Sequence, residues 1–348
     1  MIVDFTENLL RWDHLENRRH MPWKGEKDPY KIWLSEIILQ QTRVEQGLEY
    51  YNRFISTFPD VHTLANAEDE AVFKLWEGLG YYSRCKNLLH AARFVSTKLG
   101  GRFPVSYSEI LSLKGVGPYT ASAISSFAFG EKRAVVDGNV QRVLARYFGI
   151  SAPIDSAAGK QVFCQLADGL ISPDEPARYN QAIMDFGATI CKPKNPLCDT
   201  CIQRYECQAY QHGVVHQLPV KEKALKKRVR WMNYFVVRNN GSVYIRKRTK
   251  SDIWQNLHEF ILLESESSLN IVPEVFLDTL FEPHSYNVIS GQASPAQQLT
   301  HQKIYGTFYV VDLQKPAQLA DYMLVHENNL HAYAFPKFIN SFLLKHPL

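Results

Sequence analysis

The chain has 348 residues, more than one hydrophobic core usually spans, so two domains are expected. Hydrophobic residues make up 45% and charged residues 21%, the balance of an ordinary soluble globular protein. The formal net charge of +4 neither demands nor excludes nucleic acid as a partner. The N-terminus lacks the apolar core of a secretory signal, and no apolar run could span a bilayer. We therefore expect a cytoplasmic protein whose cysteines serve a metal or catalysis rather than disulfides.

Residues 29 to about 210 are predicted to form helix after helix. Asp28, followed by proline, provides an N-cap and a proline at the first helical position. Ser106 and Glu109 have the spacing of a capping box and open a short predicted helix. A further helix is predicted over residues 139–148. The first part of the chain is thus expected to be all-helical.

The character of the sequence changes after residue 210. Residues 221–230 hold six basic residues and one acidic residue, so we predict an exposed linker there rather than a core element. Two strand-like runs then flank Asn239-Asn240-Gly241, which is a hairpin signal, and residues 303–313 are another strand candidate. The prediction is a multidomain α and α+β chain, with a helical domain over 1–212, a basic linker over 213–228 and an α+β domain over 229–348.

Four of the six cysteines fall in one short run with the pattern C-x6-C-x2-C-x5-C. Thiolates spaced this closely on short loops can wrap a single metal centre. Zinc could also take four cysteines, but it usually uses two close pairs, and only one pair is close here. The pattern therefore favours an iron–sulfur cluster, with zinc as the alternative. The predicted ligands are Cys191, Cys198, Cys201 and Cys207.

Residues 113–120 form a glycine-containing hairpin signal between two predicted helices. Gly115 and Gly117 allow a tight turn and let the backbone approach a phosphate without a Cβ in the way. Pro118 suits the first turn of the next helix, whose free N–H groups favour an anion. Residues 113–120 resemble the hairpin of a helix-hairpin-helix motif, and the resemblance implies that both glycines contact the DNA backbone, which positions a protein without reading sequence.

The cysteine spacing is that of the cluster loop in the endonuclease-III superfamily of helix-hairpin-helix DNA glycosylases. Within that superfamily, residues 33–42 (WLSEIILQQT) resemble the corresponding helix of MutY-type adenine glycosylases. The resemblance implies a [4Fe–4S] cluster, Glu36 as general acid, Asp137 as stabiliser of the sugar cation, and Tyr119 orienting Asp137. Tyr119 stands where strand-cleaving relatives have a lysine, and a phenol cannot form their Schiff base.

The same resemblance implies how the lesion is reached. An adenine within a duplex must be flipped out, and side chains must fill the gap that it leaves. Residues 78–84 (GLGYYSR) resemble the intercalation loop of the family, with Leu79 and Tyr81 as wedges and Gln41 inserted beside them. Arg19 and Trp23 match positions that line the adenine pocket of the family.

Residues from about 228 onward are similar to the Nudix-like C-terminal domain of adenine glycosylases. No Nudix catalytic box is present, so we expect no magnesium-dependent pyrophosphatase activity. The family's Phe-Ser-His loop, which recognises 8-oxoguanine, corresponds to Leu299-Thr300-His301. Thr300 and His301 are therefore expected to contact the lesion, although the aromatic residue is lost.

These features together predict a monomeric, monofunctional adenine glycosylase that acts on duplex DNA with A:8-oxoguanine or A:G mispairs. One alternative is an endonuclease-III-type glycosylase and lyase for oxidised pyrimidines, against which Tyr119 and the long C-terminal part both count. A different alternative is a non-catalytic iron–sulfur protein that binds damaged DNA. The carboxylates Glu36 and Asp137, each in a matching motif, count against that alternative.

Overall fold

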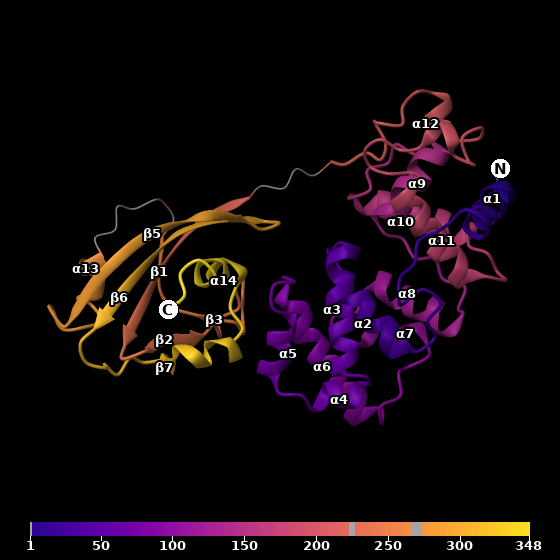
Figure 1. Cartoon of the computed structure of the whole chain (residues 1–348). Helices are drawn as coiled ribbons and strands as arrows, with labels where there is room; N and C mark the ends of the chain where they lie inside the picture. Colours follow the sequence, from indigo (N-terminus) through magenta and orange to yellow (C-terminus); the bar gives the residue numbers. More distant parts are fainter. Residues whose placement is uncertain (1, 223–226, 266, 268–272) are drawn as a thin grey trace. The chain divides into compact units, whose positions relative to one another are not determined.

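A computed structural model describes residues 2–222, 227–265, 267 and 273–348 of the chain. Its contacts divide the chain into two compact units, which we call unit 1 and unit 2 (Figure 1). Unit 1 takes in Met1–Asn66 and Asn87–Ala224, and unit 2 takes in Ala67–Lys86 and Leu225–Leu348. Residues 223–226 of the predicted basic linker lie outside the described residues, and the predicted domain boundaries remain a prediction.

Unit 1 is built from helices, and residues 2–222 contain no strand, as the sequence predicted. Its helices are α1 (Ile2–Leu15), α2 (Pro29–Leu39), α3 (Val44–Thr57), α4 (Val61–Asn66), α6 (Tyr82–Lys98, which begins in unit 2), α7 (Tyr107–Ser112), α8 (Pro118–Phe129), α9 (Gly138–Phe148), α10 (Ala157–Leu170), α11 (Pro176–Thr189), the 3-10 turn η1 (Cys198–Thr200) and α12 (Gln208–Gln211). No helix among the described residues is both long and apolar enough to cross a membrane.

The predicted helix starts are confirmed. The carboxylate of Asp28 accepts the backbone N–H of Tyr30 at 2.9 Å and caps α2, with proline at the first helical position. Ser106 caps α7, because its hydroxyl accepts the N–H of Glu109 at 3.4 Å, and the same hydroxyl donates to Oε2 of Glu109 at 2.6 Å. The helix predicted over residues 139–148 is α9, which begins one residue earlier.

The helices of unit 1 form two groups (Figure 1). In one group α11 packs against α1 and α9, around a core that includes Phe5, Tyr147, Phe163 and Phe186. In the other group α2 packs against α3 and α8. Contact between α8 and α11 joins the groups. The segment from α8 to α9, which carries Asp137, therefore passes from one group to the other.

Unit 2 contains helix α5 (Asp69–Trp76) together with a sheet and small helices. The strands are β1 (Arg228–Asn239), β2 (Ser242–Lys247), β3 (His258–Glu259), β4 (Ile261–Ser265), β5 (Tyr286–Gln298), β6 (Gln302–Leu313) and β7 (Met323–His326), and the remaining helices are α13 (Pro273–Leu277), the 3-10 turn η2 (Glu327–Ala332) and α14 (Lys337–Leu343). The α+β prediction for this part of the chain is confirmed.

The sheet of unit 2 has the order β3-β2-β1-β6-β5, with β4 paired to β1 and β7 paired to β2. Strands β1 and β6 run parallel, and the other pairs are antiparallel. β1 meets β2 through the two-residue turn Asn240-Gly241, whose φ angles of 46° and 73° suit Asn and Gly. The predicted hairpin and the strand predicted over residues 303–313 are both confirmed.

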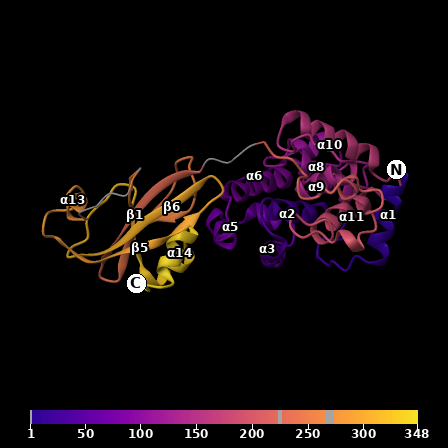
Figure 2. The same cartoon turned by 90° about the horizontal axis from the view of Figure 1, so that it is seen from above.

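The two faces of this sheet are covered by different helices, because side chains alternate along each strand. Phe308 on β6 stacks on Phe342 of α14, with ring centroids 4.2 Å apart. The next residue along β6, Tyr309, stacks on Phe235, which packs against Phe276 of α13. Figure 2 shows β1, β6 and β5 side by side, with α14 against them. The sheet is thus the middle layer of unit 2.

The prediction of an exposed basic linker is wrong at the C-terminal edge of that segment. Residues 221–230 were expected to form an exposed linker, but β1 already begins at Arg228 and pairs with β6. Arg230 is only 5% exposed. A run of basic residues usually marks a solvated segment, yet here one of the guanidinium groups is held inside the fold by acidic partners.

Candidate active site

Glu36 lies in α2, on a helix whose residues are buried almost all round. Its own residue is 8% exposed. The pKa of its carboxyl is raised to about 7, chiefly by burial; a hydrogen bond from Tyr119 opposes the rise, and the nearby charge of Asp137 adds to it. Because water cannot stabilise the charged form, Glu36 is divided between its protonated and ionised forms near neutral pH. The sequence-based expectation of a raised pKa is met.

Tyr119, the second residue of α8, connects Glu36 with α11. Its hydroxyl lies 3.6 Å from Sδ of Met184 and within hydrogen-bond reach of the Glu36 carboxyl, so its single proton can be donated to either group but not to both at once. Burial raises its pKa well above the ordinary value, so the phenol stays neutral. Sequence reasoning assigned Tyr119 to Asp137, and the charges of both Glu36 and Asp137 act on the phenol, so its role as the residue that orients Asp137 stays a prediction.

Asp137 caps the N-terminus of α9. One carboxylate oxygen accepts the backbone N–H groups of Asn139 and Val140, each at 2.8 Å, and the other accepts Nδ2 of Asn139 at 2.7 Å. Burial nevertheless raises the pKa of Asp137, because desolvation outweighs these hydrogen bonds and the charge of Arg142. Asp137 is therefore both a structural cap and a desolvated carboxylate beside Glu36.

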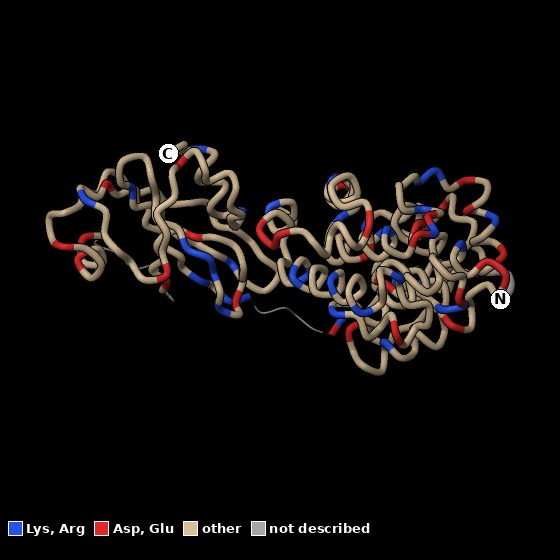
Figure 3. The backbone as a smooth tube through the Cα atoms, turned by 90° about the horizontal axis from the view of Figure 1, so that it is seen from below, with Lys and Arg blue, Asp and Glu red and all other residues tan. Residues whose placement is uncertain are grey.

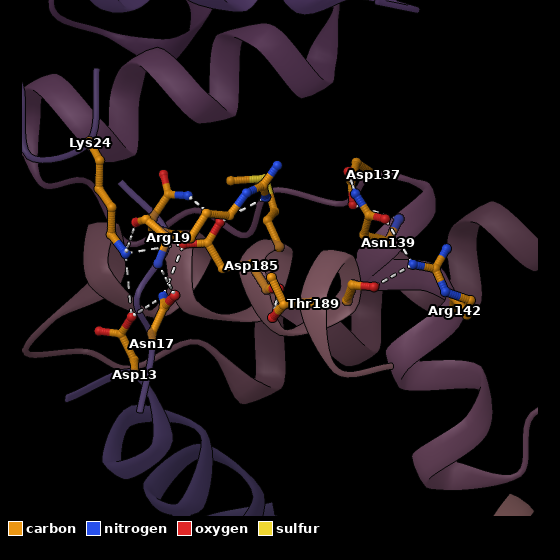
Figure 4. Close-up of polar contacts among 12 residues, drawn as sticks. Asp13, Asn17, Arg19, Lys24, Asp137, Asn139, Arg142, Asp185 and Thr189 are labelled. Carbon is orange, nitrogen blue, oxygen red and sulfur yellow. Dashed lines mark hydrogen bonds and ion pairs between the residues drawn. The ribbon is translucent and has the colours of Figure 1, made fainter. Parts of the chain in front are cut away.

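A chain of hydrogen bonds runs from Asp137 toward the cysteine loop (Figure 4). Asn139, already bonded to Asp137, accepts from Nη2 of Arg142 at 2.8 Å through its side-chain oxygen. Arg142 donates through Nε to the carbonyl of Cys191 at 2.8 Å and through Nη2 to that of Gly187 at 2.7 Å. A disturbance of the cysteine loop can therefore reach the carboxylate of Asp137.

The predicted metal ligands Cys191, Cys198, Cys201 and Cys207 all line one pocket. Nη1 of Arg146, which also lines it, lies 3.4 Å from Sγ of Cys191. Among the residues that the structure describes, no three metal-binding side chains are grouped closely enough to hold one metal ion. The loop thus brings the four cysteines to the lining of one pocket, and the described residues form no single-ion site there.

Two residues were predicted to line an adenine pocket. The indole of Trp23 is 9% exposed and packs edge-on against Tyr51, with ring centroids 5.2 Å apart. The side chain of Arg19 is 25% exposed, and its Nη1 pairs with Oδ1 of Asp185 at 3.0 Å. Both lie in the segment between α1 and α2, and the salt bridge fixes the guanidinium of Arg19 against α11.

Asp185 is a residue that the sequence analysis missed. Its side chain is fully buried, and besides Arg19 it accepts from Lys24 at 3.1 Å, Asn17 at 3.0 Å and Gln181 at 3.1 Å (Figure 4). The signal was available, since Asp185 is the one charged residue in the run AIMDFG of residues 182–187. A buried acid of this kind requires compensating partners. It directly follows Met184, the partner of Tyr119.

The predicted phosphate-binding hairpin has the expected backbone. Gly115 has a φ of +83°, and a Cβ there would lie 2.7 Å from Cβ of Asn87, so a side chain is excluded on both grounds. Gly117 is the N-cap of α8, and Pro118 is the first residue of that helix. The N–H groups of the first turn of α8 therefore flank a glycine turn, which is the arrangement expected for contact with a phosphate.

The predicted insertion residues differ in exposure. Tyr81 is 41% exposed and Leu79 is only 6% exposed, so Tyr81 is available as a wedge whereas Leu79 is packed inside. Gln41 and Tyr81 have φ angles of 57° and 49°, in the left-handed region that glycine favours. Non-glycine residues held in this region are enriched at functional sites.

The loop predicted to read the lesion is the turn between β5 and β6. Thr300 and His301 are exposed at its tip. Within unit 2, the hydroxyl of Thr300 hydrogen-bonds that of Tyr81. A residue predicted to enter the duplex and a residue predicted to contact the lesion therefore lie together, which the sequence could not reveal.

Comparison with known proteins agrees with the helical fold of the first part of the chain and the α+β fold of the second. Residues 34–162 match the HhH-GPD superfamily of base excision DNA repair proteins, and residues 233–345 match the NUDIX domain. A solved structure of a thermostable thymine-DNA glycosylase is 32% identical, with a TM-score of 0.57, over 61% of this chain and 97% of that one. An endonuclease III–DNA complex, 20% identical with a TM-score of 0.53, shares the fold. Fold and site thus define a helix-hairpin-helix DNA glycosylase with a Nudix-like domain.

Curated relatives show to which family of DNA glycosylases the chain belongs. Adenine DNA glycosylase of Buchnera aphidicola subsp. Schizaphis graminum is 34% identical over 74% of this chain and 75% of its own length. That of Mus musculus is 40% identical over 65% of this chain and 47% of its own length. The chain belongs to the adenine DNA glycosylase family, enzymes of base excision repair that hydrolyse an N-glycosidic bond.

Proposed function

We propose that this enzyme flips adenine out of duplex DNA and removes it where it is opposite 8-oxoguanine or guanine, with Glu36 as general acid and Asp137 as stabiliser of the sugar. The observation that carries the proposal is the buried Glu36 beside Asp137. Its pKa of about 7 makes it a proton donor at the pH at which the enzyme must work. Two carboxyls in different environments suit two different roles.

The proposed step moves one proton and breaks one bond. Glu36 gives its proton to N7 of the flipped adenine, and the electrons of the N-glycosidic bond leave with the base. Positive charge then develops on the sugar, and ionised Asp137 stabilises it as a cation or as a covalent intermediate. Water completes the hydrolysis. Glycosidases that cut bonds to oxygen divide these tasks between two carboxyls in the same way.

Tyr119 supports a monofunctional enzyme. A phenol cannot form the Schiff base through which strand-cleaving relatives open the sugar. Within hydrogen-bond reach of Glu36 and of Met184, Tyr119 would fix the carboxyl that donates the proton. We therefore expect an intact strand with an abasic site as the product. The lysine of the strand-cleaving relatives corresponds to Tyr119 on α8. Lys114 of this chain lies in the exposed hairpin before that helix.

The remaining predicted residues would hold the DNA. Gly115 and Gly117 would grip a backbone phosphate, Tyr81 and Gln41 would fill the gap, and Arg19 with Trp23 would receive the base. The buried Leu79 would serve as a wedge only if its loop opened. Thr300 and His301 would contact the base opposite adenine. The proposal takes the enzyme to act as a monomer.

A [4Fe–4S] cluster is part of the proposal. Endonuclease-III superfamily members usually carry one, and the donor set here fits it, because four cysteines line one pocket together with the cation Arg146. When bound, the cluster would supply folding free energy and link α11 to α12 through its ligands. The residues that would hold it are Cys191, Cys198, Cys201 and Cys207.

Single-turnover cleavage of a panel of duplexes tests the function. The panel places A opposite 8-oxoguanine, G and T, T opposite G, and thymine glycol opposite A, each with and without alkali. We expect alkali-dependent breaks at A opposite 8-oxoguanine and at A opposite G. Cleavage of T opposite G would favour the thymine glycosylase activity that the structural relative carries in its name. Alkali-independent nicking at thymine glycol would favour an endonuclease-III activity.

The variant Glu36→Gln tests the assignment of the acid. Loss of a general acid costs about 10²- to 10⁴-fold in rate, so we expect a loss of that order with duplex binding retained. Glu109→Gln is the matched control, because Glu109 is an exposed glutamate on a helix of the same unit. A Glu36→Gln enzyme that is as fast as the wild type would remove Glu36 from the mechanism.

A further inference from the structure

The guanidinium of Arg230 in unit 2 is buried and uses every one of its N–H groups. It donates to both carboxylate oxygens of Glu264, at 2.6 and 2.8 Å, and to both of Asp252, at 2.8 and 2.6 Å. The fifth N–H is directed to Oε1 of Gln302 at 3.2 Å. Arginine has five donors in a rigid fork, so two bidentate carboxylates and one amide satisfy it completely.

Gln302 is the residue at which the predicted lesion loop closes. Its carbonyl accepts the N–H of Leu299 at 2.8 Å, and this bond forms the turn that carries Thr300 and His301. On the other side, the carbonyl of His301 accepts the N–H of Arg228 at 2.9 Å. The base of the loop is therefore tied to β1 twice, once through backbone at Arg228 and once through the side chain of Arg230.

The network continues away from the loop through alternating charges. Asp252 also pairs with Arg248 at 3.1 Å, Arg248 pairs with Glu259, and Glu259 pairs with Arg246 at 3.0 Å. Figure 3 shows Lys and Arg in blue along neighbouring strands of unit 2, with Asp and Glu in red among them. Such a network fixes the directions of its members more than it adds stability, because burial of the charges offsets their attraction.

We propose that Arg230 is a positioning residue for recognition of the base opposite adenine, acting through Gln302 on the loop Leu299-Thr300-His301. The inference rests on the proposed function, in which that loop contacts 8-oxoguanine. The basic run of residues 221–230 did not indicate this role for Arg230 in the sequence. Arg230 itself touches no DNA, and its contribution is the fixed direction of two exposed side chains.

The chemistry of the lesion explains why position matters. 8-Oxoguanine differs from guanine by an N–H donor at N7 and a carbonyl acceptor at C8, where guanine has an acceptor and a C–H. A hydroxyl and an imidazole can distinguish the two only if they are held in register with these atoms. A loop that loses its anchor keeps its side chains but loses that register, so discrimination falls while removal of adenine continues.

The test compares Arg230→Met and Arg230→Lys with the matched control Arg238→Met in the full-length protein. Arg238 lies near the other end of β1 and pairs with Asp312 at 2.7 Å, so the control removes an ion pair from the same strand far from the loop. The measurements are single-turnover rates at A:8-oxoguanine and at A:G, and the melting temperature of each variant.

We expect Arg230→Met to lower the ratio of the two rates by about 3- to 10-fold, the scale of one hydrogen bond, with the A:G rate unchanged. The rate ratio of Arg230→Lys should fall between those of Arg230→Met and the wild type, because lysine keeps the charge but lacks the planar fork of five donors. Arg238→Met should leave the ratio unchanged. Removal of Arg230 leaves carboxylates that are only about one-third exposed, so the melting temperature reports whether folding is the cause.

Two results would overturn the inference. One is an unchanged ratio in folded Arg230→Met, and the other is an equal fall of both rates, which would mean a merely structural role. A Thr300→Ala, His301→Ala double variant separates this failure from failure of the proposed function. If the double variant lowers the ratio and Arg230→Met does not, only the role of Arg230 is wrong. If the wild type itself does not prefer 8-oxoguanine, the proposed lesion recognition is wrong.

Discussion

The pocket around Glu36 in unit 1 and the network around Arg230 in unit 2 both bury charged groups, but they do so in different ways. Glu36 has no cationic partner among the causes of its shift, and burial raises its pKa to about 7. Burial alone would lower the pKa of Arg230, but hydrogen bonds from its guanidinium to Glu264 and Asp252 outweigh burial and raise it. One group can change its protonation near neutral pH, and the other is fixed in its charged form.

The two ways of burying charge suit two different roles, proton donation by Glu36 and positioning by Arg230. A proton donor must still hold its proton when the reaction begins, so its charged form cannot be strongly stabilised. A positioning residue must keep one charge state, so every donor needs an acceptor. Asp185 shows that unit 1 also contains a compensated group, since its buried carboxylate faces Arg19 and Lys24. Compensation therefore follows the role of the residue rather than the unit.

Asp185→Ala should have the largest effect on stability. Removal of one member of a buried ion pair costs about 3 to 5 kcal/mol, and the partial exposure of Arg19 and Lys24 reduces this to about 2 to 4 kcal/mol. Urea unfolding followed by far-UV circular dichroism would measure the loss in the transition of unit 1. Asp168→Ala, at an exposed position of α10, is the control. An equal stability of the two variants would mean that the network around Asp185 contributes nothing.

Glu36→Gln should raise the stability of the protein, whereas Asp185→Ala should lower it. The folded-state pKa of about 7 lies above the ordinary 4.5, so ionisation of Glu36 favours the unfolded chain, and the cost grows as the pH rises from about 4.5 to 7. The neutral variant avoids this cost and should gain about 1 to 3 kcal/mol at pH 8 but little at pH 4. Urea unfolding at both pH values measures the gain. A variant less stable than the wild type at pH 8 would contradict the uncompensated burial of Glu36.

The helical unit could be predicted from local signals. The caps of α2 and α7 depend on residues three or fewer positions apart, and the start of α9 on Asp137, so a short window of sequence contains the cause. The strands β1 and β2 followed from strand-like runs on either side of Asn239-Asn240-Gly241, and β6 from a further run of that kind. Glu36 and Asp137 were identified by motif, whereas their proximity depends on how α2 packs against α8 and how α9 follows it.

Non-local partnerships could not be predicted in this way. The partners of Arg230 lie 22, 34 and 72 positions away along the chain, and the basic run around it resembles a solvated linker until those acids are in place. Asp185 receives Arg19 from 166 positions away. Whether Tyr119 serves Asp137 or Glu36 is likewise not contained in the sequence, because the choice depends on side-chain direction in the packed helices.

The smallest expected effect is a shift in the pH dependence of the reaction. The single-turnover rate of the wild type should fall as the pH rises through about 7, because ionised Glu36 cannot donate a proton. The hydrogen bond from Tyr119 lowers the pKa of Glu36, so Tyr119→Phe should move the descending limb to higher pH. A hydrogen bond of about 0.5 to 1.5 kcal/mol corresponds to a shift of roughly 0.4 to 1 pH unit. Rates measured from pH 5.5 to 9 would show the shift, and Glu36→Gln should show no such limb. A limb that moves to lower pH in Tyr119→Phe would mean that the phenol stabilises the protonated carboxyl instead, and that Glu36 is the donor in their hydrogen bond.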